Sequence, residues 1–279
     1  MEDNFLNAQG ITKFLSEESG VQKARLDLKS LLILGFMAGA FISFGGMISV
    51  VVLTDSSFFI GKALSKILAG MFFSMGLLLV LLSNAELFTG NSLMLISLFN
   101  KKITFIRLLR NWFFVYLANF LGSMCLAILL FYSGIWKNDQ YLYAQTIHSI
   151  ALKKVSLPII EAFFRGVLCN WLVCLAIWMS FSSKAIVNKF FAILLPITSF
   201  IALSFEHSVA NMFILPFAYL TQTSLSTISI PTTTIPSMIE LNWTTILSNN
   251  LLPVSLGNIV GGVFFVSFIF WLAYCHQKL

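Results

Sequence analysis

Long apolar runs separated by short polar segments organise this chain of 279 residues. Six of the runs are long enough to cross the hydrocarbon core of a bilayer, about 30 Å thick, as helices. They span residues 31–53, 67–99, 111–132, 158–181, 190–222 and 251–275. The polar residues 1–30 have weak amphipathic spacing, which is typical of a cytosolic or interfacial helix. The pattern predicts an all-α membrane protein with a cytoplasmic segment at 1–30 and a six-helix transmembrane domain at 31–279.

The second and fifth runs are too long for one straight crossing, and a similar polar sequence interrupts each near its middle. The interruptions are A-E-L-F-T-G-N at 85–91 and F-E-H-S-V-A-N at 205–211. In each, a glutamate precedes an asparagine by five residues, which gives the pairs Glu86–Asn91 and Glu206–Asn211. Backbone groups freed by a break at this depth must line a cavity or contact other protein. We therefore expect helices 2 and 5 to be broken.

Other small and polar residues recur between the two halves of the chain. Asn111, Asn119 and Gly122 in the third run have the same spacing as Asn250, Asn258 and Gly261 in the sixth, and Gly39 and Ser43 in the first run correspond to Gly166 and Asn170 in the fourth. Convergence among glycine-rich helices is an alternative explanation for part of this match. Because each half, 31–132 and 158–275, has three spans, the halves must have opposite orientations. The sequence predicts an inverted 3+3 repeat with a site near the midplane.

Composition and charge support a membrane location. The chain is 58% hydrophobic and 10% charged, whereas a soluble domain has about 25% charged residues. On the side of the membrane where the N-terminus is placed, the segments between the predicted spans and at the chain ends contain eleven Lys and Arg residues. The segments on the other side of the membrane contain five. The positive-inside rule then places both termini in the cytoplasm of a multi-pass protein of the plasma (inner) membrane.

Several classes of site are excluded by the same composition. Lys and Arg form no clustered patch, so no nucleic-acid partner is expected. The four cysteines lie in apolar runs without a C-x-x-C motif and are expected to be buried thiols: Cys125, Cys169, Cys174 and Cys275. With three histidines in the chain, we expect neither a metal site nor a cofactor.

His207 is the most informative single residue, because histidine titrates near neutrality and lies here at the predicted midplane. It would be suited to pass a proton to a weak-acid anion; the alternative is a hydrogen bond that only joins helices. Thr89 lies in the other interruption, where its hydroxyl can donate or accept a hydrogen bond and either serves the path or only joins helices. Asn170 lies about 18 Å along the fourth span at 1.5 Å per residue, also near the midplane, where it either lines the path or joins helices.

The charged residues near the interruptions have two interpretations each. For Glu86 and Glu206 we favour capping of the N–H groups of the following half-helix over direct contact with substrate. Lys153 and Lys154, at the outer end of the fourth span, would either concentrate anions or lie at the membrane interface. Arg165 is expected to pair with another helix or subunit.

These motifs together resemble those of the formate/nitrite transporter family of anion channels. The similar segments are G-A-F-I-S-F-G-G (39–46), A-E-L-F-T-G-N (85–91), N-W-L-V-C-L-A-I-W-M-S (170–180), F-E-H-S-V-A-N-M (205–212) and G-N-I-V-G-G (257–262). They occur in order across 31–275.

The resemblance implies a homopentamer with one pore in each protomer and a six-span fold similar to aquaporin. It implies a polar midpoint at His207 and Thr89, a functional Asn170 and a vestibule lysine at Lys154. It also implies apolar constrictions, with Phe73, Leu77 and Phe200 on the cytoplasmic side and Leu87, Phe88 and Val173 on the outer side. The expected substrates are formate or nitrite with protons, and hydrosulfide or lactate are the alternatives within the family.

An ion without a counter-charge crosses apolar constrictions at far greater cost than its neutral acid. We therefore expect Lys154 to attract the anion and His207, with Thr89, to protonate or polarise it. Two rival functions are weaker. A neutral-solute channel of aquaporin type would be expected to contain N-P-A motifs, which this sequence lacks. An enzyme using Ser208 or Glu206 with His207 would lack a second catalytic carboxylate and a metal cluster.

Overall fold

A computed structural model describes residues 5–227 and 241–275. Residues 1–4 and 276–279, at the two ends of the predicted domains, lie outside the described residues. The N-terminal segment forms α1 (Ala8–Phe14), a π-helical turn (Leu15–Ser19) and α2 (Gly20–Arg25). It packs against the transmembrane helices, because Ile11 and Leu15 are buried and Ser97 Oγ donates to the Leu15 carbonyl oxygen at 2.9 Å.

The first half of the chain begins with α3 (Leu28–Leu82), which comprises two helices joined at Gly61. Asp27 caps its start by accepting a hydrogen bond from the Ser30 N–H at 3.0 Å, and this bond lowers the pKa of the Asp27 carboxyl. Gly61 has a φ of 77°, a conformation that glycine adopts readily and that reverses the chain here. The helix ends at Leu82, and the chain becomes helical again at a 3₁₀ turn (Gly90–Met94), followed by α4 (Leu95–Phe99) and α5 (Phe105–Tyr132).

The second half begins after a 3₁₀ turn (Ile135–Lys137) and α6 (Asn138–Val155). It contains α7 (Ile159–Ser180), α8 (Ile186–Ala202) and α9 (Ser208–Thr227). Its last helical stretch comprises α10 (Trp243–Thr245), a π-helical segment (Ile246–Leu251), α11 (Leu252–Gly262), a second π-helical segment (Val263–Phe268) and α12 (Ile269–Tyr274). The helix α6 was not expected from the sequence, because its amphipathic residues fall between two predicted spans.

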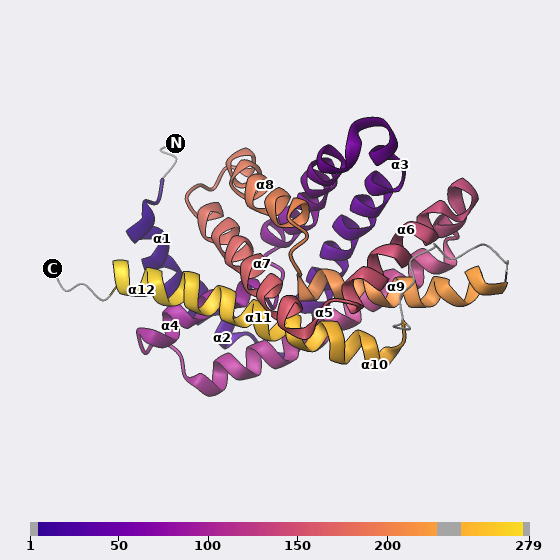
Figure 1. Ribbon diagram of the computed structural model, residues 1–279. Coiled ribbons are helices and arrows are strands. Elements are labelled where there is room, and N and C mark those ends of the chain that lie inside the picture. Colours follow the sequence, from indigo (N-terminus) through magenta and orange to yellow (C-terminus); the bar gives the residue numbers. More distant parts are fainter. Residues whose placement is uncertain (1–4, 228–240, 276–279) are drawn as a thin grey trace.

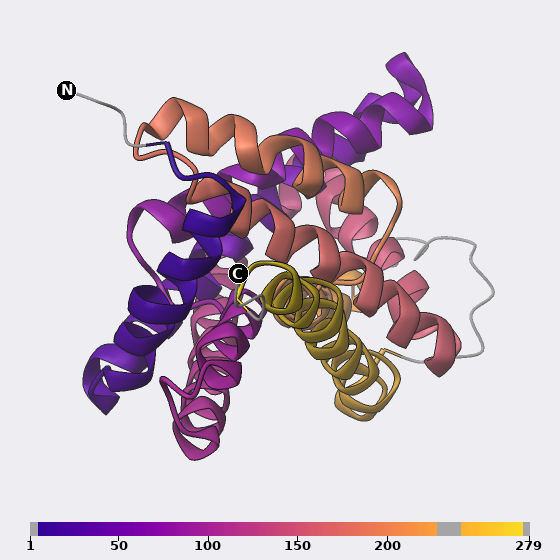
Figure 2. The ribbon, with the colours of Figure 1, turned by 90° about the vertical axis from the view of Figure 1, so that its left-hand side faces the viewer.

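Five helical stretches of the described chain are long and apolar enough to cross a membrane: Leu28–Ser56, Phe58–Leu82, Phe105–Tyr132, Ile159–Ser180 and Trp243–Tyr274. The shorter apolar helices Gly90–Phe99 and Ile186–Ala202 lie next to the two interruptions. The fold is therefore all-α and suited to a membrane, and the count of six spans stays a prediction. The helices α1 and α12 lie at one end of the molecule, and α6 lies at the other (Figure 1). Figure 2 views the molecule from the end that carries α1 and α12.

Glycines allow the closest helix contacts, at the same relative places in both halves. A methyl group added at Gly122 of α5 would collide with the carbonyl oxygen of Phe36 in α3. A methyl group at Gly261 of α11 would collide in the same way with the carbonyl oxygen of Val167 in α7. Small residues permit such close approach of backbones within membranes. The sequence repeat thus corresponds to a repeated helix crossing, α3 with α5 and α7 with α11.

We predict that Gly122→Ala destabilises the protein by about 1 to 3 kcal/mol, because the α3 and α5 backbones must move apart. The measurement is the melting temperature of purified protein in detergent. The neighbouring Leu121→Ala is the control, since Leu121 is 58% exposed on the outer surface of the same helix. Equal melting temperatures for the wild type and Gly122→Ala would show that this crossing is not tight.

Candidate functional site

The two interruptions meet at a single hydrogen bond between Thr89 and His207. Thr89 Oγ1 lies 2.9 Å from His207 Nε2, although 118 residues separate them in sequence. Thr89 is fully buried, and His207 is 3% exposed. The ring of Phe200 stacks on the imidazole at a centroid distance of 5.9 Å. The structure therefore brings together the pair that the sequence indicates as the polar midpoint.

The hydrogen bond made by the other ring nitrogen of His207, Nδ1, indicates which nitrogen carries the proton. The backbone N–H of Ala210 donates to His207 Nδ1 at 3.1 Å. A backbone N–H is only a donor, so Nδ1 is an acceptor and the neutral ring carries its proton on Nε2. Nε2–H then donates to Thr89 Oγ1. The hydroxyl proton of Thr89 has no acceptor among the described residues.

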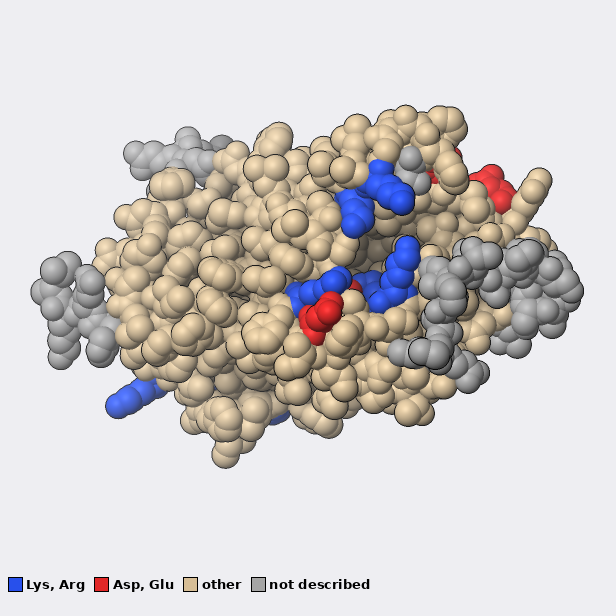
Figure 3. Space-filling model, viewed as in Figure 1, with Lys and Arg blue, Asp and Glu red and all other residues tan. Residues whose placement is uncertain are grey.

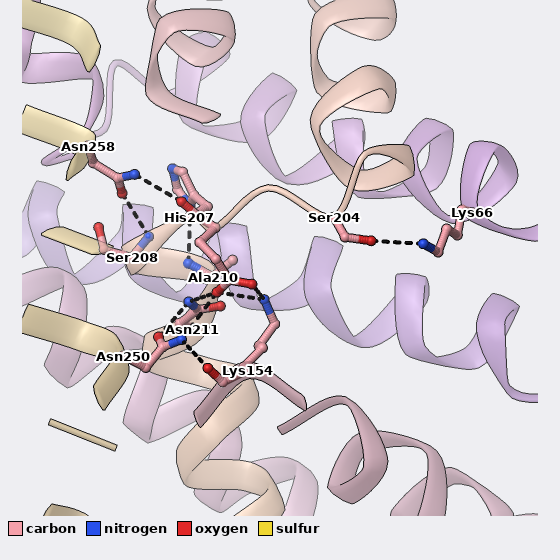
Figure 4. A network of polar contacts seen from close by, with 10 residues as sticks. Lys66, Lys154, Ser204, His207, Ser208, Ala210, Asn211, Asn250 and Asn258 are labelled. Atoms are coloured by element: carbon pink, nitrogen blue, oxygen red, sulfur yellow. Dashed lines mark hydrogen bonds and ion pairs between the residues drawn. The ribbon is translucent and has the colours of Figure 1, made fainter. Parts of the chain in front are cut away.

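The carboxylate of Glu206 is bound by a network of charged and amide groups, of which Lys154, Asn211 and Asn250 are labelled in Figure 4. Its two carboxylate oxygens accept from Lys154 Nζ at 2.9 and 3.0 Å. Asn211 Nδ2 donates to Glu206 Oε2 at 2.7 Å, and Asn250 Nδ2 donates to the same atom at 3.2 Å. Asn250 also donates to the backbone carbonyl oxygen of Lys154 at 3.2 Å. The charge of this nearly buried carboxylate is thus fully accommodated.

Glu86 has the corresponding network in the first half. Lys23 Nζ contacts Glu86 Oε1 at 2.6 Å, and Asn91 Nδ2 and Asn111 Nδ2 donate to Oε2 at 2.8 and 3.2 Å. Asn111 also donates to the backbone carbonyl oxygen of Lys23 at 3.4 Å. The expectation that these glutamates cap the next half-helix is wrong, because neither carboxylate accepts a hydrogen bond from a backbone N–H of the described residues. Each instead neutralises a lysine.

Sequence reasoning missed Lys23 as a site residue. It lies in the N-terminal segment, in α2, whereas Lys154 lies in α6, and neither helix belongs to the repeated spans. Lys23 precedes Asn111 by 88 residues, and Lys154 precedes Asn250 by 96. Because these separations differ, aligning the two halves does not pair the lysines.

Two further asparagines hold the backbone of the interruptions. The side chain of each donates two hydrogen bonds to carbonyl oxygens and accepts one from a backbone N–H. Asn119 Nδ2 donates to the carbonyl oxygens of Gly35 (2.7 Å) and Glu86 (2.8 Å), and Asn119 Oδ1 accepts from the Phe88 N–H (2.9 Å). Asn258 Nδ2 donates to the carbonyl oxygens of Gly166 (2.8 Å) and Glu206 (2.9 Å), and Asn258 Oδ1 accepts from the Ser208 N–H (2.9 Å). The sequence indicated both residues as members of the repeat but not this role.

Asn170 lies beside the centre but contacts backbone atoms. It is fully buried, and its Nδ2 donates to the carbonyl oxygens of Thr89 at 3.2 Å and Asn258 at 2.6 Å. It lines neither of the two cavities described next. Of the two interpretations of this residue, its contacts match the one in which it joins helices and fixes the backbone that carries Thr89.

Two cavities approach the central pair from opposite sides. The Lys154 cavity, of about 790 Å³, is lined by Lys154, His207 and residues of α3, α6, α7, α8 and α9. The Lys23 cavity, of about 300 Å³, is lined by Lys23, Leu87, Gly90 and residues of the N-terminal helices. The hollow of the Lys154 cavity and the Lys and Arg side chains around it are visible in Figure 3.

The apolar residues expected to form constrictions are placed differently from the prediction. Phe73 and Phe200, expected on the side of the N-terminal segment, line the Lys154 cavity, with ring centroids 5.5 Å apart in an edge contact. Leu87, expected on the opposite side, lines the Lys23 cavity. The reason is helix direction. The second part of α3 runs from Lys62, which lines the Lys154 cavity, to Val80 and Leu81, which line the Lys23 cavity. Phe73 precedes these last residues and faces the Lys154 cavity.

The remaining three expected constriction residues line neither cavity: Leu77 (1% exposed), Phe88 (6%) and Val173 (2%). Phe88 packs against the rings of Trp112 and Tyr116 in α5, with centroids 6.2 and 4.8 Å away.

Arg165 also differs from expectation, since it pairs with Glu161 one turn away on its own helix, at 3.2 Å.

We predict that Glu206→Gln destabilises the protein by roughly 3 to 5 kcal/mol, because it leaves the ammonium of Lys154 without its counter-charge. The lysine side chain is only 16% exposed. The double variant Lys154→Met with Glu206→Gln should recover much of the loss. Glu161→Gln is the control, since its ion pair with Arg165 is exposed and contributes about 0 to 1 kcal/mol. Equal melting temperatures for Glu206→Gln and Glu161→Gln would refute the prediction.

Comparisons with known proteins relate the whole chain to one family. The model of the formate/nitrite transporter family matches residues 14–272. The probable formate transporter of Methanothermobacter thermautotrophicus is 36% identical over 272 residues, which cover 91% of this chain and 92% of that protein. The formate channel FocA of Escherichia coli (strain K12) is 31% identical over 269 residues, covering 95% of this chain and 93% of that protein.

Solved structures give the same result. A pentameric formate channel with formate bound has a TM-score of 0.76 and 33% identity, covering 88% of this chain and 97% of that chain. An FNT family ion channel has a TM-score of 0.80 and 28% identity, covering 94% and 98%. With its several apolar helices, the chain is a multi-pass membrane protein. It belongs to the formate/nitrite transporter family.

Proposed function

We propose that this protein is a channel for small monovalent weak-acid anions, formate or nitrite, and that it acts by permeation without catalysing a reaction. The observation that carries the proposal is the buried Thr89–His207 hydrogen bond between two cavities. The named relatives support it, since they are described as formate channels or transporters. A homopentamer with one pore in each protomer is proposed by analogy with the pentameric formate channel.

The proposed membrane arrangement has six spans in two inverted halves, with helices 2 and 5 broken at the interruptions. Both termini lie in the cytoplasm and the Lys154 cavity opens outside, in the plasma (inner) membrane. The Lys and Arg distribution supports this orientation. The Lys23 cavity is then the inner one. An anion from either side reaches the centre without passing through the lipid.

At the centre, a chain of two hydrogen bonds would run from His207 through Thr89 to the anion. Nε2–H of His207 donates to Thr89 Oγ1, and the Thr89 hydroxyl donates to an anion oxygen. Such chains strengthen each bond when no water competes. Net proton transfer requires the imidazolium: its Nε2 proton passes to Thr89 Oγ1 as the threonine proton passes to the anion, which leaves neutral histidine and neutral acid. Forming the imidazolium at Nδ1 breaks the contact with Ala210 N–H.

We predict that His207→Phe reduces uptake of labelled formate or nitrite into proteoliposomes by about 100-fold, the scale of a lost general acid. Wild-type uptake should fall as the pH rises from 5 to 8, because fewer imidazolium groups form. His148→Phe is the control. Burial lowers the pKa of His148, so it is neutral at pH 7, and it lies in α6 bonded to Gln222 at 3.3 Å. Wild-type uptake that does not change across this pH range would sink the protonation step.

The threonine has its own test. Thr89→Val keeps the shape of the side chain but removes the hydroxyl that donates to the anion, so uptake should fall by at least about tenfold, equivalent to the loss of about 1.4 kcal/mol of stabilisation. Thr89→Ser keeps the hydroxyl and should retain most of the activity. Similar uptake by the valine and serine variants would exclude a role for the hydroxyl.

The identity of the anion is tested with a panel. Uptake of formate, nitrite, hydrosulfide and lactate is measured in one reconstituted preparation, with water flux measured by stopped-flow light scattering. We expect formate or nitrite to be carried fastest. Water flux without flux of any anion would overturn the proposed function in favour of a neutral-solute channel.

A further inference from the structure

The wall of the Lys154 cavity formed by α3 carries two lysines that the proposed mechanism does not use. Lys62 and Lys66 follow the Gly61 turn and are four residues apart on a helix, and both line the cavity. Residues at this spacing share one face of a helix, and like charges there disfavour each other. An anion bound at this cavity wall would therefore reduce the repulsion between the two ammonium groups.

No acidic side chain compensates this pair within the described part of the cavity. Glu206 is the sole acid among the described lining residues, and both of its oxygens are bound by Lys154. Lys66 Nζ donates to the neutral hydroxyl of Ser204 at 2.8 Å. Among the described residues, Lys62 has neither an ion pair nor a side-chain hydrogen bond. The uncompensated positive charge of this wall is thus on Lys62 and Lys66, whereas that of Lys154 is neutralised.

Lys66 also contacts the segment that leads to the central histidine (Figure 4). Ser204 lies three residues before His207 and has a φ of 56°, in the left-handed region that favours glycine. The bond from Lys66 ties this residue to α3. An anion at Lys66 would therefore be next to the loop that carries Glu206 and His207.

We propose that Lys62 and Lys66 form an anion-docking site in the Lys154 cavity, which takes a small monovalent oxyanion before it reaches His207. The inference rests on the proposed function, which supplies the anion. Two uncompensated cations with low-dielectric walls around them raise the local concentration of anions. Such a site changes the concentration needed for half-maximal uptake and leaves the step at the centre unchanged.

The test compares the kinetics of labelled formate uptake by reconstituted protein at low and high ionic strength. Lys62→Gln and Lys66→Gln should each raise KM about threefold or more at low salt, with the maximal rate unchanged, and the difference should shrink at high salt as screening increases. Lys62→Arg and Lys66→Arg keep the charge and should keep the wild-type KM. Lys184→Gln removes the same charge from an exposed position that lines neither cavity and is the control.

Ser204→Gly separates docking from a purely structural role of Lys66. Glycine suits the left-handed conformation, and the variant removes the hydrogen bond while the ammonium stays. We expect its KM to equal that of the wild type. A rise in KM equal to that of Lys66→Gln would show that the bond to the loop matters and would overturn the docking site.

Unchanged KM in both glutamine variants at low salt would also overturn the site while the proposed function stands. An absence of anion uptake by the wild type would instead sink the proposed function, and the docking site with it. If Lys66→Gln does not fold, the Lys62 variants decide by themselves, since the side chain of Lys62 makes no hydrogen bond with the described residues that the substitution would remove.

Discussion

Backbone groups within a bilayer must find their hydrogen-bond partners inside the protein, and the rest of this structure depends on that constraint. The helical regions end at Leu82 and Ala202 and begin again at Gly90 and Ser208. Between them the backbone has lost its helical partners. Asn119 and Asn258 supply the replacements, each with two donated bonds and one accepted bond. The closest glycine crossings of α3 with α5 and of α7 with α11 bring these asparagines within reach.

The second consequence is electrostatic. Each interruption carries a glutamate that is almost completely buried, and a buried carboxylate is stable only with a counter-charge and hydrogen bonds. Lys23 and Lys154 supply the charge from helices outside the repeated spans, and so α2 and α6 are attached to the transmembrane core. The neutralisation of Lys154 in turn changes its role. Among the described residues that line its cavity, the lysines without an ion pair are Lys62 and Lys66 of α3 and Lys153 of α6. Between the two networks, His207 and Thr89 are left as a neutral pair with one proton available.

Much of the fold followed from the sequence, because apolar runs, glycine spacing and the recurrence of Glu and Asn are local or periodic signals. They indicated the helices, the interruptions, the repeat and the pair at the centre. They failed where partners come from outside the periodic regions. Lys23 could not be paired with Glu86, since the connections of the two halves differ in length. The direction of α3 after its turn at Gly61 placed Phe73 on the side opposite to that expected.

The sequence by itself determined that this chain is a helical membrane protein with two polar interruptions, and its motifs were sufficient to indicate the family. It did so because hydrophobic length and residue spacing are properties of neighbouring positions. Only the tertiary structure decided which groups compensate the glutamates, which nitrogen of His207 carries the proton, and that Asn170 binds backbone carbonyls. These depend on the relative placement of distant segments, where a shift of one helical turn would exchange one partner for another and leave the sequence pattern unchanged.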